Sequence, residues 1–579
     1  MHTLNKNLAN IFANMAALYQ LLNGENRFRT RAYQNASRVL DNMSEDVGEH
    51  LNQQELENMH GIGESIAEKI IEYAETGKIA QYEALKDQVP TGFIELLDVE
   101  GIGPKTLNQL HRELNVTDRE ELIAALESGE AAKLKGFGKK SVQKMLEALR
   151  RHERASGRIL LADALEIAEE IVEQMRDCAD FNKIEIAGSL RRRKTTIGDI
   201  DILVEAPKQN WQAIVECFVG MNIVEKVHQQ GKTKASVQVE FEHRDADLRL
   251  FTPGQWGAAL LYFTGSKAHN IHLRKIAKDK GWKINEYGLF RQSDNKKLAG
   301  KTEASIYEKL GLAWVPPELR EENGEIELAK QGKLPDLIEW KNIRGDLHMH
   351  SDWSDGLPEI AELAEFISEN FDYEYIVVSD HSKSSRVANG LDEKDFREQF
   401  EEIQKVNDDL GKDFVKRGVE VDILPDGSLD FEDHFLAEFD WVTASIHARF
   451  DQDNTERLLK ACENRYVNCI GHPTGRLIGK REGYPVDLEK LLTKAKETGT
   501  ALEVNAQPAR MDLEGSWIRA AVGQKVMLVI TTDSHQLGNF DLMKLGVGHA
   551  RRGWCTRDAV LNTKSWREIK KFVQAKREK

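Results

Sequence analysis

Two aspartates in the middle of the chain, Asp199 and Asp201, have a spacing that suits metal-assisted chemistry. They lie in the segment GSLRRRKTTIGDIDILV, residues 188–204, at the start of an apolar run. If this run is a strand, residues two apart share one face, so the two carboxylates lie about 6.6 Å apart along the chain and the apolar residues beside them face a core. Two carboxylates placed in this way can share a pair of hard cations.

A Gly-Ser turn and a basic loop come just before the two aspartates. Gly188 and Ser189 could present backbone donors, and residues 191–194 add three arginines and a lysine. Such groups bind a polyanion while metal ions occupy the carboxylates, and a nucleoside triphosphate with magnesium fits this description. The alternative is a solvated Asp-x-Asp on a surface strand, which the neighbouring turn and basic loop make less favoured.

Histidines and carboxylates end nearly every apolar run of the C-terminal half. Strand-like runs and helical patterns alternate there seven times, which is typical of a closed parallel barrel with its active site at the carboxyl ends of the strands. Imidazoles mixed with carboxylates suit zinc, manganese or iron, and the residues are too many for one ion. The residues at the ends of the runs are His348, His350, Asp380, His381, Glu420, His447, His472, Glu503, Asn505, Asp533 and His535.

The N-terminal region, from Leu4 to about Arg154, has apolar residues at helical spacing and almost no alternation. Within it a Gly-x-Gly turn followed by an amphipathic helix occurs three times, which predicts helix-hairpin-helix elements. Paired glycines let the backbone approach a phosphate, and the free N–H groups of the next helix face it, so DNA would be bound without base reading. Glycine can also serve only the geometry of a tight turn, but three copies favour DNA binding. The glycines are Gly61, Gly63, Gly101, Gly103, Gly136 and Gly138.

The composition indicates a multidomain protein with ordinary cores. A chain of 579 residues is long enough for about four domains. The net charge is −16, but residues 134–158 carry eight Lys and Arg against two Glu, so the acidic total does not exclude DNA binding. No membrane span or signal peptide is evident, and we expect a cytoplasmic protein. The five cysteines form no Cys-x-x-Cys pair, which argues against a disulfide framework and a zinc ribbon.

These motifs carry a resemblance to a known family. The Gly-Ser turn with Asp-x-Asp resembles the nucleotidyltransferase palm, and YFTGSKAHNIHLRKIAKDKGWKINEYGLF, residues 262–290, resembles the X-family DNA polymerases. With the histidine series, the chain resembles the bacterial X-family polymerases that carry a C-terminal PHP (polymerase and histidinol phosphatase) domain. The resemblance implies a multidomain fold: an all-α helix-hairpin-helix N-terminal region, an α/β nucleotidyltransferase palm with a thumb, and a distorted (β/α)7 PHP barrel.

The same resemblance divides the chain into six parts. Residues 313–340 have paired prolines, mixed charge and little periodicity, which is typical of a linker. The parts are a lyase-like helical domain at 1–85, a helix-hairpin-helix DNA-binding domain at 86–158, the palm at 159–257, the thumb or nascent-base-pair domain at 258–317, the linker at 318–342 and the PHP domain at 343–579.

For the palm, the resemblance implies a third metal carboxylate. The pattern Asp-x-Arg-Leu selects Asp247, although spacing alone would also allow Asp245 on the same strand face. Asp199, Asp201 and Asp247 would bind two Mg²⁺ or Mn²⁺ ions about 3.5 to 4 Å apart and activate the primer 3′-hydroxyl. The residues implied to bind substrate are Gly188, Ser189, Arg192, Gly198, Tyr262, Phe263, Gly265, Asn270 and Arg274.

For the barrel, the resemblance implies three divalent ions, with Mn²⁺, Zn²⁺ or Fe²⁺ as candidates. Clustered cations bind phosphate oxygens and generate hydroxide near neutral pH. Beside a DNA-binding region the expected substrate is a DNA 3′ end, with abasic-site incision as a further activity, whereas free-standing relatives act on a small phosphate monoester. The first ion would bind His348, His350, Glu420 and Asp533, the second Glu420, His447 and His472, and the third Asp355, His381 and His535.

Lys69 falls where the lyase members of the X family carry a Schiff-base lysine, in the pattern Gly-x-Gly-x-x-Ile-Ala-Glu-Lys. A nucleophilic lysine needs a pKa lowered by burial or by cationic neighbours. The alternative is a lysine that only contacts phosphate or is merely exposed. Ser65, where those members carry a further lysine, makes the surroundings less positive.

The leading hypothesis is a monomeric repair enzyme that binds gapped or primed DNA and dNTPs. It would fill short gaps by template-directed nucleotidyl transfer and process 3′ ends as a 3′-5′ exonuclease. One alternative is a PHP nuclease or phosphatase whose polymerase half only positions DNA. A second is a non-catalytic end-binding scaffold, which the complete sets of aspartates and histidines disfavour.

Overall fold

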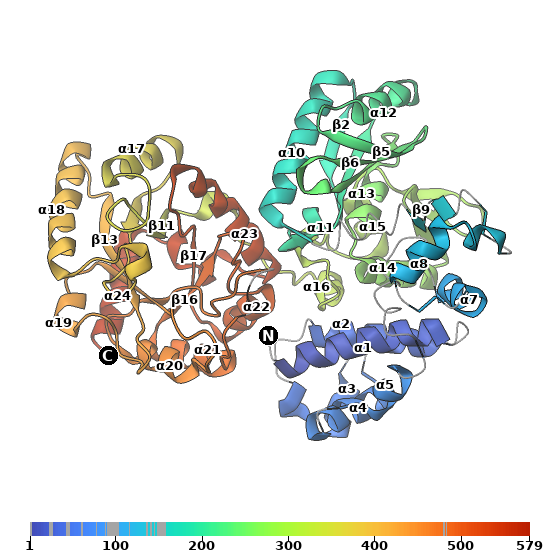
Figure 1. The fold of residues 1–579 in the computed structure, drawn as a ribbon. Coiled ribbons are helices and arrows are strands. Elements are labelled where there is room, and N and C mark those ends of the chain that lie inside the picture. The colour runs from blue at the N-terminus through green and yellow to red at the C-terminus, as the bar shows by residue number, and fades with distance from the viewer. Residues whose placement is uncertain are drawn as a thin grey trace. The chain divides into compact units, whose positions relative to one another are not determined.

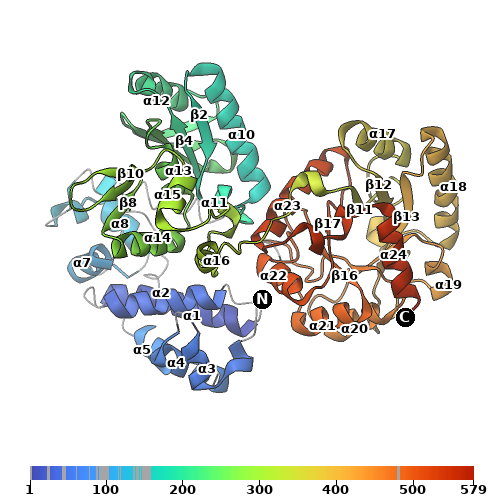
Figure 2. The same ribbon diagram turned by 180° about the vertical axis from the view of Figure 1, so that it is seen from behind.

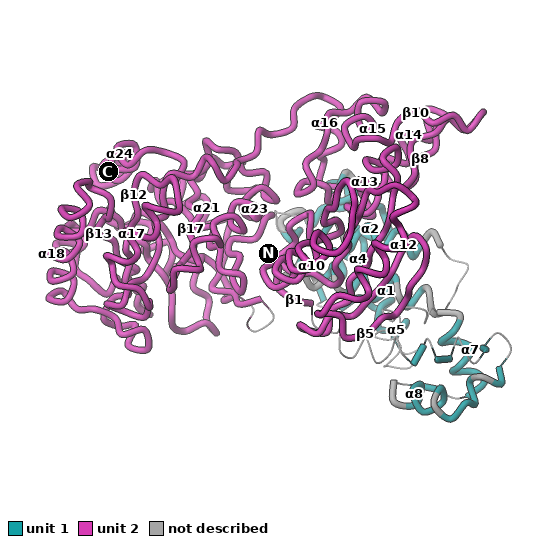
Figure 3. The backbone as a smooth tube through the Cα atoms, turned by 90° about the horizontal axis from the view of Figure 1, so that it is seen from above, with its two compact units in different colours: residues 1–157 teal, residues 158–579 magenta. Residues whose placement is uncertain are grey.

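The computed structural model divides the chain into two compact units, residues 1–157 and residues 158–579 (Figure 3). Within the described residues no helix is both long and apolar enough to cross a membrane. The structure describes residues 3–22, 27–41, 47–59, 62–76, 78–86, 89, 104–114, 116–117, 119–134, 137–138, 142–143, 145–146, 158–478, 481 and 483–579.

The first unit is helical in its described residues, as the apolar spacing predicted. Its first two helices pack on each other and bury Phe12, Met15 and Tyr33. Ile70 and Leu110, from later helices, join the same core. The helices are α1 (Thr3–Leu22), α2 (Arg27–Asp41), α3 (Gln53–Asn58), α4 (Glu64–Thr76), α5 (Ala80–Lys86), α7 (Pro104–Leu114) and α8 (Arg119–Glu127).

The second unit begins with an α/β palm whose five-stranded sheet has the order β2-β4-β7-β6-β5. β4 and β7 run parallel, and the other neighbours are antiparallel. Helices α10 and α12 pack on the face that carries Ile200, Ile202 and Leu248, which leaves the aspartates on the other face. The elements are β1 (Ile159–Leu160), α10 (Leu161–Cys178), β2 (Lys183–Ile186), α11 (Gly188–Arg191), β3 (Thr196–Ile197), β4 (Ile200–Glu205), α12 (Trp211–Val219), β5 (Val224–Gln230), β6 (Lys234–Val239) and β7 (Asp245–Phe251).

The sequence argues against a disulfide framework, but the structure joins one pair of cysteines. Cys178, the last residue of α10, and Cys217 in α12 form a disulfide with their Cα atoms 5.9 Å apart. They are 39 residues apart in the sequence, so local spacing gave no sign of the pair. The two helices meet because both pack on the same face of the sheet.

The thumb follows the palm, and the segment expected to be a linker is ordered and partly helical. Ile326 and Ala329 of α16 pack in the same core as Leu273 and Leu310 of the thumb, and Trp554 from beyond the barrel strands joins them. Weak apolar periodicity hid this helix, although glycines flank it at both ends. The elements are α13 (Trp256–Thr264), α14 (Lys267–Asp279), β8 (Trp282–Asn285), β9 (Gly288–Arg291), β10 (Lys297–Ala299), α15 (Glu303–Leu310) and α16 (Glu325–Gln331).

The C-terminal part is a nearly closed barrel of seven parallel strands in sequence order, as the alternating pattern predicted. The backbone N–H of His350 donates to Ser534, and that of Asp533 donates to His348, which brings the first and last strands together. Figures 1 and 2 show the strands inside and the helices around them. The strands are β11 (Gly345–Met349), β12 (Tyr375–Val378), β13 (Val415–Asp422), β14 (Trp441–Ser445), β15 (Cys469–Ile470), β16 (Ala501–Asn505) and β17 (Leu528–Thr531).

The helices of the barrel follow its strands, and the last one covers the amino-terminal ends of the strands. Trp566, Ile569 and Val573 of α24 pack with Tyr375 and Trp441, which begin two of the strands. The opposite mouth is therefore the open one. The helices are α17 (Ile360–Asn370), α18 (Glu393–Leu410), α19 (Asp433–Leu436), α20 (Thr455–Glu463), α21 (Leu488–Thr498), α22 (Gly515–Gln524), α23 (Leu542–Arg552) and α24 (Trp566–Arg577).

Candidate active sites

The strand register brings the three predicted carboxylates of the palm together. Asp201 on β4 lies directly beside Asp247 on β7, and Asp199 precedes Asp201 by two residues. Burial, then Asp199 and Asp247, raises the pKa of Asp201 to about 7. Burial and then Asp247 raise the pKa of Asp199. Because mutual repulsion between buried carboxylates is relieved by cations, this trio fits a divalent-metal site.

Asp245, the alternative third carboxylate, has a different partner. Its Oδ1 lies 3.1 Å from Nε2 of His228. It also raises the pKa of Asp199, but less than Asp247 does. Asp247 is paired by Arg249, whose Nη2 donates to its Oδ2 at 3.2 Å. The geometry therefore favours Asp247 over Asp245.

The Gly-Ser turn lies against the carboxylates. Gly188 has φ +61°, and a Cβ there would collide with Oδ2 of Asp201, so the turn requires glycine. Ser189 follows in α11, and Gly198 directly precedes the first carboxylate. The turn places the basic loop beside the metal site.

Arg191 and Arg192 of this loop differ in their contacts. Arg191 donates to both carboxylate oxygens of Glu303 at 3.0 Å, which ties the palm to the thumb. Arg192 donates from Nε to Glu321 at 3.0 Å and from Nη1 to the carbonyl of Thr264 at 2.6 Å. Arg192 also lowers the pKa of Asp201, so its charge acts on the carboxylates.

The predicted nucleotide-binding residues of the thumb fall into two groups. Tyr262, Asn270 and Arg274 line one pocket, where Asn270 Nδ2 donates to the Tyr262 carbonyl at 2.8 Å. Phe263 lies against β7, the strand that carries Asp247, with the guanidinium of Arg249 4.6 Å from its ring centre. Gly265, at φ +70°, joins the two helices that carry these residues.

Glu420 is the centre of the barrel cluster. Its carboxylate lies 3.0 Å from a ring nitrogen of both His381 and His472, and 3.4 Å from His447. His348 and His350 lie 3.5 and 3.7 Å away. One carboxylate therefore faces five imidazoles from four strand ends and could bridge more than one cation.

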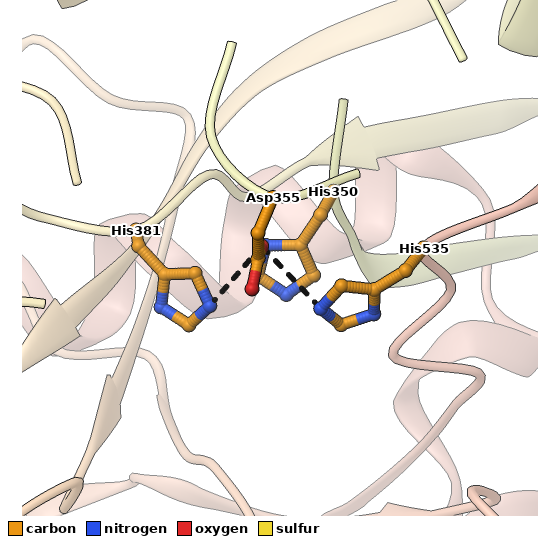
Figure 4. Close-up of side chains that lie close together, drawn as sticks. All are labelled: His350, Asp355, His381 and His535. Carbon is orange, nitrogen blue, oxygen red and sulfur yellow. Dashed lines mark ion pairs between the residues drawn. The ribbon is translucent and has the colours of Figure 1, made fainter. Parts of the chain in front are cut away.

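Two aspartates complete the cluster. Figure 4 shows Asp355 between His381 and His535, at 3.5 and 3.4 Å. Asp533 lies 3.2 Å from Nε2 of His350. The side chains group as His350, Asp355, His381 and His535; as His348, His350 and Asp533; and as His381, Glu420 and His447. All nine predicted barrel ligands therefore meet at one mouth, although His350 and His381 each belong to two of these groups.

The donor set fits divalent metal ions. Nε2 of His348, Nδ1 of His350 and Nδ1 of His381 are buried without a hydrogen-bond partner, although carboxylates lie nearby. Burial lowers the pKa of His447, but Glu420 and Asp422 more than offset this and raise it to about 10. The surplus of carboxylate charge around these imidazoles is what bound cations would balance.

A second layer of carboxylates orients the histidines. Glu503 lies 2.6 Å from Nδ1 of His348, and Asp422 lies 2.6 Å from Nδ1 of His447. Such partners fix the ring orientation of a ligating histidine. The strand-end position of Glu503 was visible in the sequence, but its role was not. Asp380, at another strand end, accepts from Ser351 and Gln399 instead.

A pocket of about 370 Å³ opens beside the cluster. Asp533 and His535 line the pocket on the side of the cluster, and Arg510 and Gln507 line it as well. Leu357, which is 75% exposed, is at its edge. These last three residues had no signal in the sequence.

In the first unit, Lys69 is buried in α4. Its Nζ donates to the carbonyl and hydroxyl oxygens of Ser65, each at 3.0 Å, and burial lowers its pKa. Gly63 lies at the exposed turn before α4, and Gly138 is also exposed. The other predicted hairpin glycines, Gly61, Gly101, Gly103 and Gly136, lie outside the described residues.

The palm and thumb, followed by the histidine-lined barrel, define a class of protein in which a nucleotidyltransferase is joined to a fold typical of metal-dependent phosphoesterases. Comparison with protein families agrees for the first two parts. Residues 158–249 match the family described as DNA polymerase beta palm, and residues 259–321 match DNA polymerase beta thumb. Residues 3–79 match a helix-hairpin-helix domain, and residues 93–151 match a SAM-like helix-hairpin-helix tandem.

Similar proteins are DNA polymerases. The "DNA polymerase/3′-5′ exonuclease PolX" of Bacillus subtilis is 39% identical over 564 residues, which cover 96% of this chain and 97% of that protein. DNA polymerase lambda of Arabidopsis thaliana is 26% identical over 55% of this chain and 62% of its own length. DNA polymerase lambda of Rattus norvegicus is 27% identical over 51% of this chain and 53% of its own length. The chain belongs to the X-family DNA polymerases that carry a C-terminal PHP barrel.

Proposed function

We propose that this protein is a DNA polymerase that fills short gaps and, in its barrel, a metal-dependent 3′-5′ exonuclease. The observation that carries the polymerase half is the parallel register of Asp201 beside Asp247, with Asp199 two residues away. The complete nine-residue cluster at the barrel mouth carries the nuclease half.

In the palm, Asp199, Asp201 and Asp247 would hold two Mg²⁺ or Mn²⁺ ions. When bound, divalent ions in either centre polarise phosphate oxygens and lower the pKa of a coordinated hydroxyl group or water. Arg192 and Ser189 face the phosphates of the incoming dNTP, and the positive charge of Arg192 attracts the triphosphate. Tyr262, Asn270, and Arg274 shape the pocket for the nascent base pair.

In the barrel, the nine ligands would hold up to three ions, with Mn²⁺, Zn²⁺ and Fe²⁺ as candidates. Glu503 and Asp422 orient His348 and His447 toward them. The adjoining pocket, at about 370 Å³, would receive the terminal nucleotide. Helix-hairpin-helix turns such as that at Gly63 would hold the DNA backbone. The cytoplasmic location and the monomeric state stay predictions.

A product time course on one-nucleotide-gapped DNA tests the proposal. With dNTPs and Mg²⁺ the primer should lengthen by one nucleotide, and without dNTPs in Mn²⁺ it should shorten from its 3′ end. Shortening without any extension would mean that the polymerase half only positions DNA. Faster hydrolysis of histidinol phosphate than of 3′-recessed DNA would instead indicate a small-molecule phosphatase.

A further inference from the structure

The basic loop of the palm packs against helix α23 of the barrel. Arg552, the last residue of α23, donates from Nη1 to the backbone carbonyl of Arg192 at 2.7 Å. The side chain of Arg193 runs along Gly548 of the same helix, where an added Cβ would lie 3.4 Å from its Cγ. Leu545 of α23 joins the apolar core of the palm. The barrel therefore touches the segment that faces the triphosphate.

Glu321 connects the two parts through a shared carboxylate oxygen. Its Oε1 accepts from Arg192 Nε at 3.0 Å and from Arg552 Nη1 at 3.1 Å. The three side chains are between 11% and 17% exposed, so solvent screens their charges only in part. Burial would raise the pKa of Glu321, but Arg552, Arg192 and Lys194 outweigh it and bring the pKa to about 2. Glu321 is therefore charged at neutral pH.

A carboxylate shared in this way competes with a bound triphosphate. Glu321 and the phosphates both attract the guanidinium of Arg192, and Arg552 supplies a second cation that neutralises part of the Glu321 charge. Without Arg552, Arg192 is held more strongly at Glu321, because the repulsion between the two guanidinium groups that share this carboxylate is removed. The guanidinium is then less free to turn to the phosphates.

We propose that Arg552, in the barrel, is a positioning residue for polymerisation that keeps Arg192 available to the triphosphate of the incoming dNTP by neutralising Glu321. This inference rests on the proposed polymerase function. It makes the affinity of the palm for the nucleotide depend on the contact between α23 of the barrel and the basic loop. By linkage, nucleotide binding must stabilise this contact by the same coupling free energy.

The test is single-nucleotide incorporation on one-nucleotide-gapped DNA at a series of dNTP concentrations. Supplying each nucleotide as its α-thio analogue leaves a phosphorothioate linkage at the new 3′ end, which keeps the barrel from removing the product. Arg552→Ala should raise KM for dNTP about tenfold and leave kcat within about twofold, since a ground-state contact is lost. Arg552→Lys, which keeps the charge, should stay within about threefold of the parent KM.

Two further variants separate this role from a general loss of structure. Arg551→Ala is the matched control, because Arg551 donates to Glu318 and the Ile338 carbonyl rather than to Glu321 or the Arg192 carbonyl, and its KM should equal that of the parent. Glu321→Gln should have a KM no higher than the parent. Adding Glu321→Gln to Arg552→Ala should cancel most of the tenfold rise, which is a coupling that a double-mutant cycle measures.

Equal KM values for Arg552→Ala and Arg551→Ala would overturn the proposal. So would a rise in KM that Glu321→Gln leaves unchanged. If Arg552→Ala does not fold, as judged by thermal melting, Arg552→Gln takes its place under the same criteria. Absence of extension in the parent protein would refute the proposed polymerase function instead, so the two failures are distinguishable.

Discussion

Neighbouring strands decide which aspartates of the palm can act together. Asp201 and Asp247 are partners in a parallel pair, so their carboxylates leave the sheet side by side. Asp245, two residues earlier, is engaged by His228 at 3.1 Å. Two acidic residues of one strand thus have different surroundings.

This difference predicts the outcome of two matched substitutions. Asp247→Asn should lower the rate of primer extension at least about a hundredfold, because charge stabilisation by a bound ion is worth several kcal/mol and each ~1.4 kcal/mol is tenfold. Asp245→Asn should retain most of the activity. Steady-state extension of gapped DNA measures both, and the reverse order of the two variants would show that Asp245 is the ligand.

Lys69 can be tested for lyase chemistry in the same way. Burial lowers its pKa, so more of its amine is neutral at a given pH, and borohydride trapping on an incised abasic site should increase with pH. Lys69→Arg keeps a charge for phosphate contact but forms no stable Schiff base, so the adduct should disappear while DNA binding persists. An adduct that survives Lys69→Arg would assign the chemistry elsewhere.

Single residues were predictable where a local pattern exposed them. The alternation around Asp199 and the strand-end histidines were visible in the sequence. The fold gathers the aspartates in the palm and, separately, the histidines at the barrel mouth. The partner of His348 is Glu503, 155 residues away, and no local spacing links the two. Arg510 and Gln507 of the barrel pocket follow a strand end without a pattern of their own.

At the scale of elements, each site is supported by helices that pack on its sheet away from the functional side chains. α24 packs on the amino-terminal ends of the barrel strands, opposite the metal cluster. Trp566, at 7% exposure, contacts the Tyr375 ring with 5.1 Å between ring centres. The strands are held from this end while the other end carries the ligands.

Truncating this contact should weaken the barrel. Trp566→Ala should lower the free energy of unfolding by about 3 to 5 kcal/mol, the usual range for a buried large aromatic side chain. Arg567→Ala, at an exposed position of the same helix, should change it by less than about 0.5 kcal/mol. Chemical denaturation monitored by circular dichroism measures both. Equal stability of the two variants would mean that α24 does not support the barrel.

Elements were predictable when their periodicity was strong. The seven strand-helix alternations of the barrel follow from apolar spacing alone. The helix α16 was missed because mixed charge obscures its apolar face, which Ile326 and Ala329 form. The disulfide between Cys178 and Cys217 depends on the packing of α10 against α12, which spacing does not encode.

At the scale of the whole molecule, one chain carries two metal-type centres with different donors. The palm offers three carboxylates, which suit Mg²⁺ or Mn²⁺, and the barrel mixes imidazoles with carboxylates, which suits transition metals. The sequence predicted both centres, but the contact between Arg552 and the basic loop joins residues 360 positions apart and could not be read from it.

The most direct test of two separate centres is one product time course on gapped DNA with Asp201→Asn and Glu420→Gln. Asp201→Asn should abolish extension with dNTPs and Mg²⁺ while 3′ trimming in Mn²⁺ continues at the parent rate. Glu420→Gln should do the reverse. Loss of both activities in either folded variant, or trimming that survives Glu420→Gln, would contradict the assignment of synthesis to the palm and hydrolysis to the barrel.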